Sequence, residues 1–216
     1  GKENILYKKA LRERASEGKI MIAKKNASIL SKLPGIKGVF ITGALSMNNA
    51  EEEYDIDLMI ITKRNRLWTT RLFAYLLLKV MNSSVRKPKE ENQRDKLCLN
   101  IWLDESALSW SKKDRNIYSA HEIAQVIPVV NKGGIYQTFL QKNSWILDFW
   151  PNSVRLDNTN NKERKNRKRI GLFEKLSFWL QYKYMKKKIT KEKVSLHRAI
   201  FHPRNWGEMV LKKLST

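Results

Sequence analysis

The segment Ile56–Thr62 is the feature that most constrains the fold of this chain. After Asp57 its residues are apolar at both odd and even positions, and alternate residues of a strand point to opposite faces. A strand that is apolar on both faces must be covered on both sides, as central strands of α/β proteins are. We therefore expect Ile56–Thr62 to be a central strand with helices on both sides.

Other β-branched and aromatic runs predict strands at Ile36–Thr42 and Leu97–Leu103. Pro128 limits the short strand Val126–Val130 to a sheet edge, because proline cannot donate a ladder hydrogen bond. Apolar residues at three-and-four spacing predict helices at Asn4–Glu17, Ile20–Leu33, Leu67–Met81, Asn116–Gln125, Ile135–Phe149, Leu172–Lys187 and Val194–Leu214.

The connecting segments are polar. We expect a break at Gly18 between the first two helices, a loop over Ala44–Tyr54, and a loop or ragged edge strand over Asn82–Lys96. The fold class is therefore α/β: a small mixed sheet with flanking helices over residues 1–150, followed by a basic, mainly helical C-terminal region over residues 151–216.

Positive charge dominates the composition. The chain carries 43 Lys and Arg against 21 Asp and Glu, and residues 151–216 alone carry 18 basic and five acidic side chains. Lys162–Arg169 holds six of these basic residues. Such a field attracts polyanions, so we expect RNA to bind through the basic C-terminal region. A solvated surface, or a basic helix lying on anionic lipid, remains an alternative.

Several classes of protein are disfavoured by composition. The lone cysteine, Cys98, excludes a disulfide framework and points to a reducing cytoplasm. The first residues are charged with no apolar segment behind them, so no secretory signal is expected. The most apolar stretch, Leu67–Met81, is shorter than the roughly 20 residues that span a bilayer, so no membrane-spanning segment is expected.

The candidate chemistry lies where Asp55 and Asp57 enter the central strand. Residues two apart in a strand project from the same face, so the two carboxylates lie side by side. Two adjacent carboxylates raise one another's pKa unless a cation lies between them. Hard oxygen ligands of this kind suit Mg²⁺ that is shared with substrate phosphates.

The run from Pro34 to Gly43, followed by Ser46 and then by Asp55-Ile56-Asp57-Leu58, resembles the minimal nucleotidyltransferases of the DNA polymerase β-like superfamily. The similarity covers roughly Ile20–Phe149. It implies transfer of a nucleoside monophosphate from an NTP to a hydroxyl acceptor, with release of pyrophosphate. It also implies that Asp55 and Asp57 ligate Mg²⁺, that Gly43 lets the backbone approach the triphosphate, and that Ser46 contacts a phosphate. Ala44 stands where the family's serine normally follows the glycine.

The family's third carboxylate lies on a later strand. The positions that would share one face of the Leu97–Leu103 strand are Cys98, Asn100 and Trp102, and none is acidic. We therefore expect either Asn100 as a weaker oxygen ligand or Asp104, at the end of the strand, to complete the site.

The function expected is thus Mg²⁺-dependent nucleotidyl transfer, most simply to an RNA end. Transfer to a protein or a small molecule is an alternative, although the positive charge argues against a cationic acceptor such as an aminoglycoside. The other alternative is a non-catalytic RNA-binding module on a decayed transferase fold. An acid within about 5 Å of the Asp pair favours catalysis, and Asn100 alone favours the binding module. The oligomeric state does not follow from the sequence.

Overall fold

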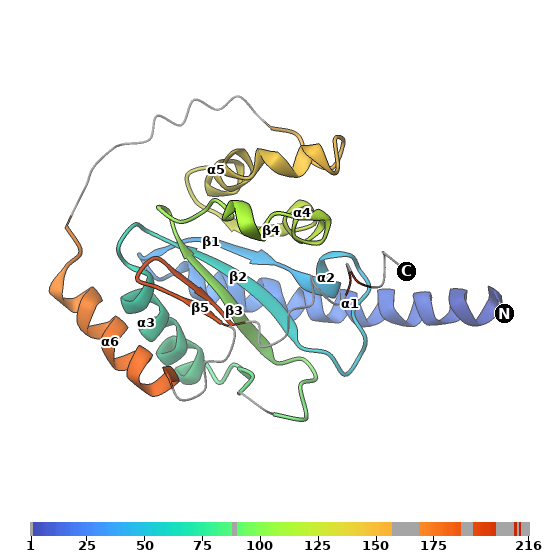
Figure 1. Ribbon diagram of the computed structural model, residues 1–216. Helices are drawn as coiled ribbons and strands as arrows, with labels where there is room; N and C mark the ends of the chain where they lie inside the picture. The colour runs from blue at the N-terminus through green and yellow to red at the C-terminus, as the bar shows by residue number, and fades with distance from the viewer. Residues whose placement is uncertain are drawn as a thin grey trace.

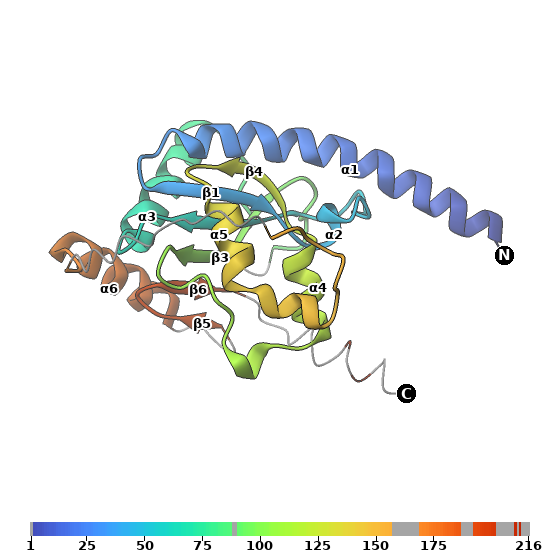
Figure 2. The same ribbon diagram turned by 90° about the horizontal axis from the view of Figure 1, so that it is seen from above.

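The computed structural model describes residues 2–87, 90–156, 169–186, 192–201, 210 and 212 of the chain. These residues form an α/β fold around one six-stranded sheet, with the strand order β4-β1-β2-β3-β6-β5 (Figures 1 and 2). The strands are β1 (Ile36–Ile41), β2 (Ile56–Thr62), β3 (Leu97–Asp104), β4 (Ile127–Asn131), β5 (Lys193–Val194) and β6 (Arg198–Ile200). β2 and β3 are parallel and the other neighbouring pairs are antiparallel, so the sheet is mixed.

Helices lie on both faces of the sheet (Figure 2). They are α1 (Lys2–Ser31), α2 (Gly43–Ser46), α3 (Leu67–Val80), α4 (Ile117–Ala124), α5 (Ile135–Lys142) and α6 (Leu172–Lys186), with 3₁₀ turns at Lys112–Asp114 and Ser144–Asp148. α1 and α3 pack on one face, and α4 and α5 pack on the other. α3 is the crossover that connects the parallel pair β2 and β3.

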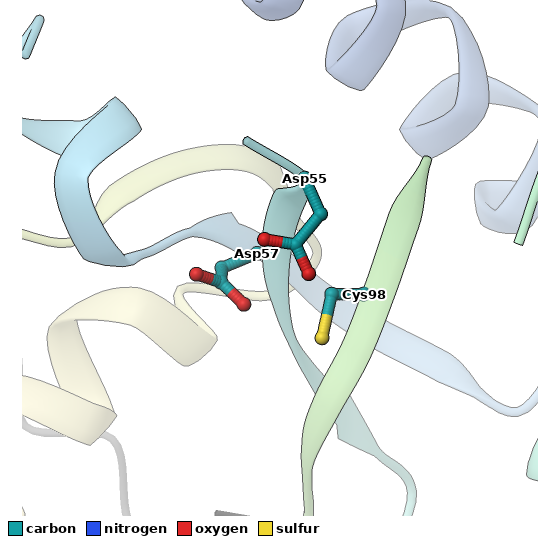
Figure 3. A group of neighbouring side chains, drawn as sticks. All are labelled: Asp55, Asp57 and Cys98. Carbon is teal, nitrogen blue, oxygen red and sulfur yellow. The ribbon is translucent and has the colours of Figure 1, made fainter. Parts of the chain in front are cut away.

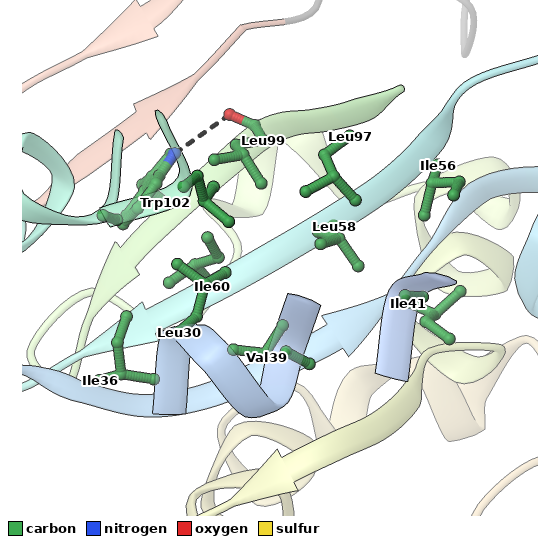
Figure 4. Close-up of a cluster of buried hydrophobic side chains, with 14 of the residues drawn as sticks. Leu30, Ile36, Val39, Ile41, Ile56, Leu58, Ile60, Leu97, Leu99 and Trp102 are labelled. Carbon is green, nitrogen blue, oxygen red and sulfur yellow. Dashed lines mark hydrogen bonds between the residues drawn. The ribbon is translucent and has the colours of Figure 1, made fainter. Parts of the chain in front are cut away.

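β2 is buried on both faces, as its sequence predicts. Ile56, Leu58 and Ile60 point into the cluster under α1 and α3 (Figure 4). Met59 and Ile61 point into the second cluster, under α4 and α5. This arrangement leaves the first residues of β2 at one end of the sheet, next to the end of β1. The core therefore supports the position of Asp55 and Asp57 from both sides.

Four predicted elements are different in the structure. Gly18 does not break a helix, because α1 runs without interruption through it, and α2 forms at the start of the predicted loop Ala44–Tyr54. The predicted helix Ile135–Phe149 is divided at Asn143, whose buried amide group donates to the Leu108 and Phe139 carbonyls and accepts from the Trp110 amide. The predicted helix Val194–Leu214 begins as a hairpin of β5 and β6 instead.

The C-terminal elements are part of the same sheet and core. β6 pairs with β3, because the Phe201 amide donates to the Asn100 carbonyl and the strands continue in register from there. α6 packs against α3, and the buried Glu174 carboxylate accepts hydrogen bonds from the Trp68 and Thr69 amides at 2.6 and 3.0 Å. Glu174 thus satisfies amide groups of the first turn of α3 that have no partner within the helix.

We expect Glu174→Ala to lower the free energy of unfolding by about 2–4 kcal/mol, because it leaves buried amide donors without an acceptor and removes an anion from a helix N-terminus. Urea denaturation measures this change. Glu17→Ala, at an exposed position of α1, is the control and should change it by less than about 0.5 kcal/mol. Equal effects of the two substitutions would contradict the role given to Glu174.

Candidate metal centre

Asp55, Asp57 and Cys98 meet at one end of the sheet. Asp55 immediately precedes β2, Asp57 is its second residue, and Cys98 lies opposite Asp57 on the parallel strand β3. One ligand atom from each lies within 4.8 Å of the other two, and the three side chains point toward one another (Figure 3). The sequence prediction that the two carboxylates share one face is therefore confirmed.

Gly43 closes the site on the β1 side. Its φ of 65° lies in the left-handed region that glycine adopts without strain. A Cβ atom at this position would lie 2.7 Å from the Asp57 Oδ2 atom, so any other residue would collide with the carboxylate. The Thr42 amide also donates to the Asp57 carbonyl at 3.1 Å. Glycine is thus required at this position for the backbone that follows β1 to lie close to the acidic pair.

Asp57 is held in an environment that opposes its negative charge. Burial, and then the charge of Asp55, raise the pKa of Asp57 from its ordinary value of 3.8 to about 7. Asn100 relieves part of this cost, because its Nδ2 atom donates to the Asp57 Oδ1 atom at 2.6 Å. The Asn100 Oδ1 atom is buried and has no hydrogen-bond partner among the described residues. A cation would compensate both the crowded carboxylates and this amide oxygen.

Cys98 is a weaker candidate ligand than the two carboxylates. Burial, and then the charges of Asp57 and Asp55, raise the pKa of its thiol well above the ordinary value. The neutral thiol is a poor ligand for a hard cation such as Mg²⁺, which prefers oxygen. The donor set that fits Mg²⁺ is therefore Asp55 and Asp57, with the Asn100 side chain in contact with Asp57.

Arg86 is a site residue that the sequence analysis missed. Its Nη1 atom donates to the Asp55 Oδ2 atom at 2.7 Å and lies 3.7 Å from the Cys98 sulfur. The backbone places it there because Val85 forms a bridge with Leu97, and the Arg86 amide donates to the Leu97 carbonyl. Arg86 therefore balances the charge of one carboxylate.

α4 contributes an acid, Glu122, that the sequence analysis also missed. The charge of Glu122 adds to the effects that raise the pKa of Asp57. Burial raises the pKa of Glu122 itself, and its carboxylate accepts from Gln125 at 3.0 Å. Burial, and then the charges of Glu122 and Asp57, raise the pKa of Tyr118 to about 12. The signal in the sequence is the spacing of four residues between Tyr118 and Glu122, which places both on one face of the helix.

Strand β3 does not alternate as predicted. The register between β2 and β3 shifts between the Asp57–Cys98 and Met59–Ile101 pairs. Cys98 and Asn100 still lie on the side of Asp57, but the shift turns Trp102 into the opposite core cluster. There the Trp102 indole donates to the Leu99 carbonyl at 3.0 Å (Figure 4). The prediction that Trp102 shares a face with Asn100 is thus wrong, because a bulge adds one residue to β3.

Asp104 does not reach the metal centre. It is paired with Thr62, five residues beyond Asp57 on β2, which is about 16 Å along the strand. Its buried carboxylate accepts from the Asn65 amide at 3.0 Å and the Ser106 amide at 2.8 Å, and it contacts the His197 Nδ1 atom at 2.7 Å. The expectation that Asp104 completes the site is therefore corrected, because the parallel pairing places it at the far end of the sheet.

Ser46 lies in α2, on the chain that leaves Gly43. Its hydroxyl donates to the Gly43 carbonyl at 2.7 Å. In this arrangement the Ser46 hydroxyl stabilises the turn at Gly43, and its contact with a phosphate stays a prediction.

A buried lysine of α1 positions the chain that carries Asp55. The Lys19 side chain is 2% exposed, and its ammonium group donates to the Glu52 and Tyr54 carbonyls at 2.9 and 2.6 Å. It also binds the Asp95 carboxylate at 2.8 Å, just before β3 begins. Lys19 thus joins the segments that enter both strands of the site.

We expect Lys19→Met to lower the free energy of unfolding by about 2–4 kcal/mol, because it leaves two carbonyls and a carboxylate without their donor. Urea denaturation measures this change. Lys24→Met, at an exposed position of the same helix, is the matched control and should change it little. A small effect at both positions would contradict the anchoring role of Lys19.

The pKa of Asp57 predicts a pH-dependent stability. Between its ordinary value and about pH 7 the folded protein retains this proton and the unfolded chain loses it, so the free energy of unfolding falls as the pH rises. Asp57→Asn removes this loss. We expect the variant to match the wild type below pH 4 and to be about 2 kcal/mol more stable at pH 8 without metal. Exposed Asp148→Asn should show no such trend, and a pH-independent gain at Asp57 would contradict the raised pKa.

Neither a scan against models of protein families nor a search of curated proteins gives a match to this sequence. The site is therefore characterised by the geometry of its own residues. Its features are two converging carboxylates, a glycine at a position where a side chain would meet Asp57, and a buried amide oxygen that has no partner in the described part of the chain.

Proposed function

We propose that this chain is a Mg²⁺-dependent nucleotidyltransferase of the DNA polymerase β-like type, which moves a nucleoside monophosphate from an NTP to a hydroxyl acceptor. The observation that carries the proposal is the convergence of Asp55 and Asp57 beside Gly43, at the junction of an antiparallel and a parallel strand pair. The mixed sheet with helices on both faces is compatible with that family's core.

The residues at the site fit Mg²⁺. Asp55 and Asp57 would hold the ion, and the Asn100 side chain, whose amide nitrogen donates to Asp57, lies next to them. When bound, Mg²⁺ supplies positive charge that stabilises the phosphates and the developing charge of an in-line displacement. Metal binding would also offset the repulsion between the two carboxylates, because each ionised carboxylate would be attracted to the cation between them.

The protein groups around the carboxylates would orient the substrate. Gly43 lets the backbone lie against the Asp57 carboxylate, and the triphosphate would bind beside this pair. Arg86, which binds Asp55 in the absence of metal, is a cation within reach of the same space and suits a phosphate oxygen. In the reaction the acceptor oxygen forms a bond to the α-phosphorus, the bond to pyrophosphate breaks, and the acceptor hydroxyl loses its proton.

For the acceptor we propose an RNA end. The support is the net charge of +22, concentrated in the last third of the sequence. The basic segment Lys162–Arg169 falls almost entirely on residues 157–168, which lie outside the described residues. Its contact with RNA is therefore a proposal from sequence and charge.

One observation favours the alternative, a non-catalytic RNA-binding module. Asn100, and not an acid, lies 2.6 Å from Asp57 at the position expected for a third carboxylate. Asn100 carries no charge and would hold a second cation weakly. Glu122 is the acid from another element whose charge reaches Asp57, and it would supply the missing anion if it approached the substrate.

We expect Mg²⁺ and NTP together to raise the Tm of the wild type by about 2–4 °C beyond the effect of either alone, because the metal bridges carboxylates and triphosphate. Differential scanning fluorimetry with each NTP measures this shift. Asp55→Asn and Asp57→Asn should abolish the joint shift, and exposed Asp148→Asn should retain it.

Incubation with labelled NTPs and total RNA separates the two functions. The transferase labels RNA in a manner that requires Asp57, whereas the binding module shows the joint Tm shift or RNA binding without label. Label transfer by a purified Asp57→Asn variant would contradict the proposed mechanism.

A further inference from the structure

Helix α6 is apolar on the face that packs against the protein and also on the face that meets solvent. Its packed face joins α3 through Phe178, which contacts Trp68, and through Gln181, which donates to the Trp68 carbonyl at 2.8 Å. The opposite face exposes Leu172, Phe173, Leu176, Trp179 and Leu180, with exposed fractions between 50% and 81%. Exposed apolar side chains that gather on one face of a helix mark a surface that normally binds a partner. Solvent alone is therefore an unfavourable environment for the outer face of α6.

Helix α3 has exposed apolar positions of its own. It lies beside α6 on the outside of the sheet (Figure 1). Its outward positions are Leu72, Phe73, Leu76 and Val80, which are 39–76% exposed and recur at the three-and-four spacing of one helix face. Two adjacent helices thus present apolar side chains away from the core. We call the exposed positions of these two helices together the α3–α6 face.

The charges around the α3–α6 face are of one sign. α3 contains no acidic residue, and the one acid of α6, Glu174, is buried against α3. Lys79, Lys175, Lys183 and Lys186 are exposed on these two helices. The Lys183 ammonium also lies 5.1 Å from the Trp179 ring centre.

We infer that the α3–α6 face binds the surface of an anionic phospholipid bilayer. Aliphatic and aromatic side chains interleaved with lysines match such a surface, where the acyl boundary receives the apolar groups and the lipid phosphates receive the ammonium groups. None of the described helices has the length and apolar character required to cross a bilayer, so the helices would lie along it. Trp179 and Tyr184 suit the headgroup level, because each combines an apolar ring with a polar atom.

The aliphatic side chains distinguish this partner from RNA. RNA binding uses lysines for phosphates and aromatic rings for bases, but leucines at exposed helix positions offer no stacking surface. The N-terminal half of α1 is a useful contrast. It also exposes apolar residues, among them Leu11, but unlike the exposed part of α6 it carries an acid, Glu13, and Glu17 follows one turn later. Acidic groups of that kind would be repelled by an anionic bilayer.

Vesicle flotation with the full-length chain tests the inference, using phosphatidylcholine vesicles with and without phosphatidylserine. The wild type should float with the phosphatidylserine vesicles and bind the neutral vesicles much more weakly. Leu176→Glu should weaken binding about tenfold, because it removes an apolar group that enters the lipid. Leu11→Glu is the matched control, since both leucines are 50% exposed and both variants change the net charge equally.

The lysines are tested in the same assay. Lys183→Gln combined with Lys186→Gln should weaken binding to phosphatidylserine vesicles more than Lys24→Gln combined with Lys25→Gln on α1, although both pairs are exposed. Unchanged urea midpoints verify that the variants remain folded. The inference is overturned if the wild type does not float with anionic vesicles, or if the α6 and α1 variants lose binding equally. It is also overturned if Leu176→Glu reduces RNA binding or self-association and leaves flotation unchanged.

Discussion

The buried ammonium group of Lys19 is the interaction on which the geometry of the acidic site depends. It donates hydrogen bonds to two carbonyls in the segment before Asp55 and to one carboxylate in the segment before β3. Neither segment has regular structure of its own at these points, so their ends are fixed by a donor from α1. Because Lys19 has three N–H donors and three acceptors, each donor is matched. The two strands consequently begin at a defined distance from each other, and Asp57 and Cys98 become neighbours.

That geometry places like charges together, which the fold must compensate. Arg86 neutralises Asp55, Asn100 donates to Asp57, and the raised pKa lets Asp57 remain protonated near neutral pH. The compensation is incomplete at Asn100, because its oxygen has no partner among the described residues. A divalent cation between the two carboxylates would offset their repulsion directly, which is the reason that a metal is the simplest ligand for this end of the sheet.

Local patterns predict the elements of this fold better than they predict its long-range contacts. The apolar strand Ile56–Thr62 and the spacing of Asp55 and Asp57 follow from residue periodicity alone. The bulge that turns Trp102 away from Asn100 depends on the register between strands, which one segment does not specify. Lys19 and Arg86 come from segments 36 and 31 residues from Asp55, so their roles emerge only when tertiary contacts bring the segments together. The hairpin of β5 and β6 likewise depends on the exposed edge of β3.

The two surfaces proposed for ligands lie on opposite sides of the sheet. Asp57 shares its face of β2 with Met59 and Ile61, which point toward α4 and α5. The α3–α6 face belongs to helices on the other side of the sheet, where α3 covers the core and α6 packs against α3 (Figure 1). A bilayer bound by α3 and α6 would therefore leave the acidic pair directed away from the lipid. α6 can serve this purpose because Glu174 and Gln181 hold its inner face on α3 by directional hydrogen bonds, and its outer apolar side chains remain free for a second partner.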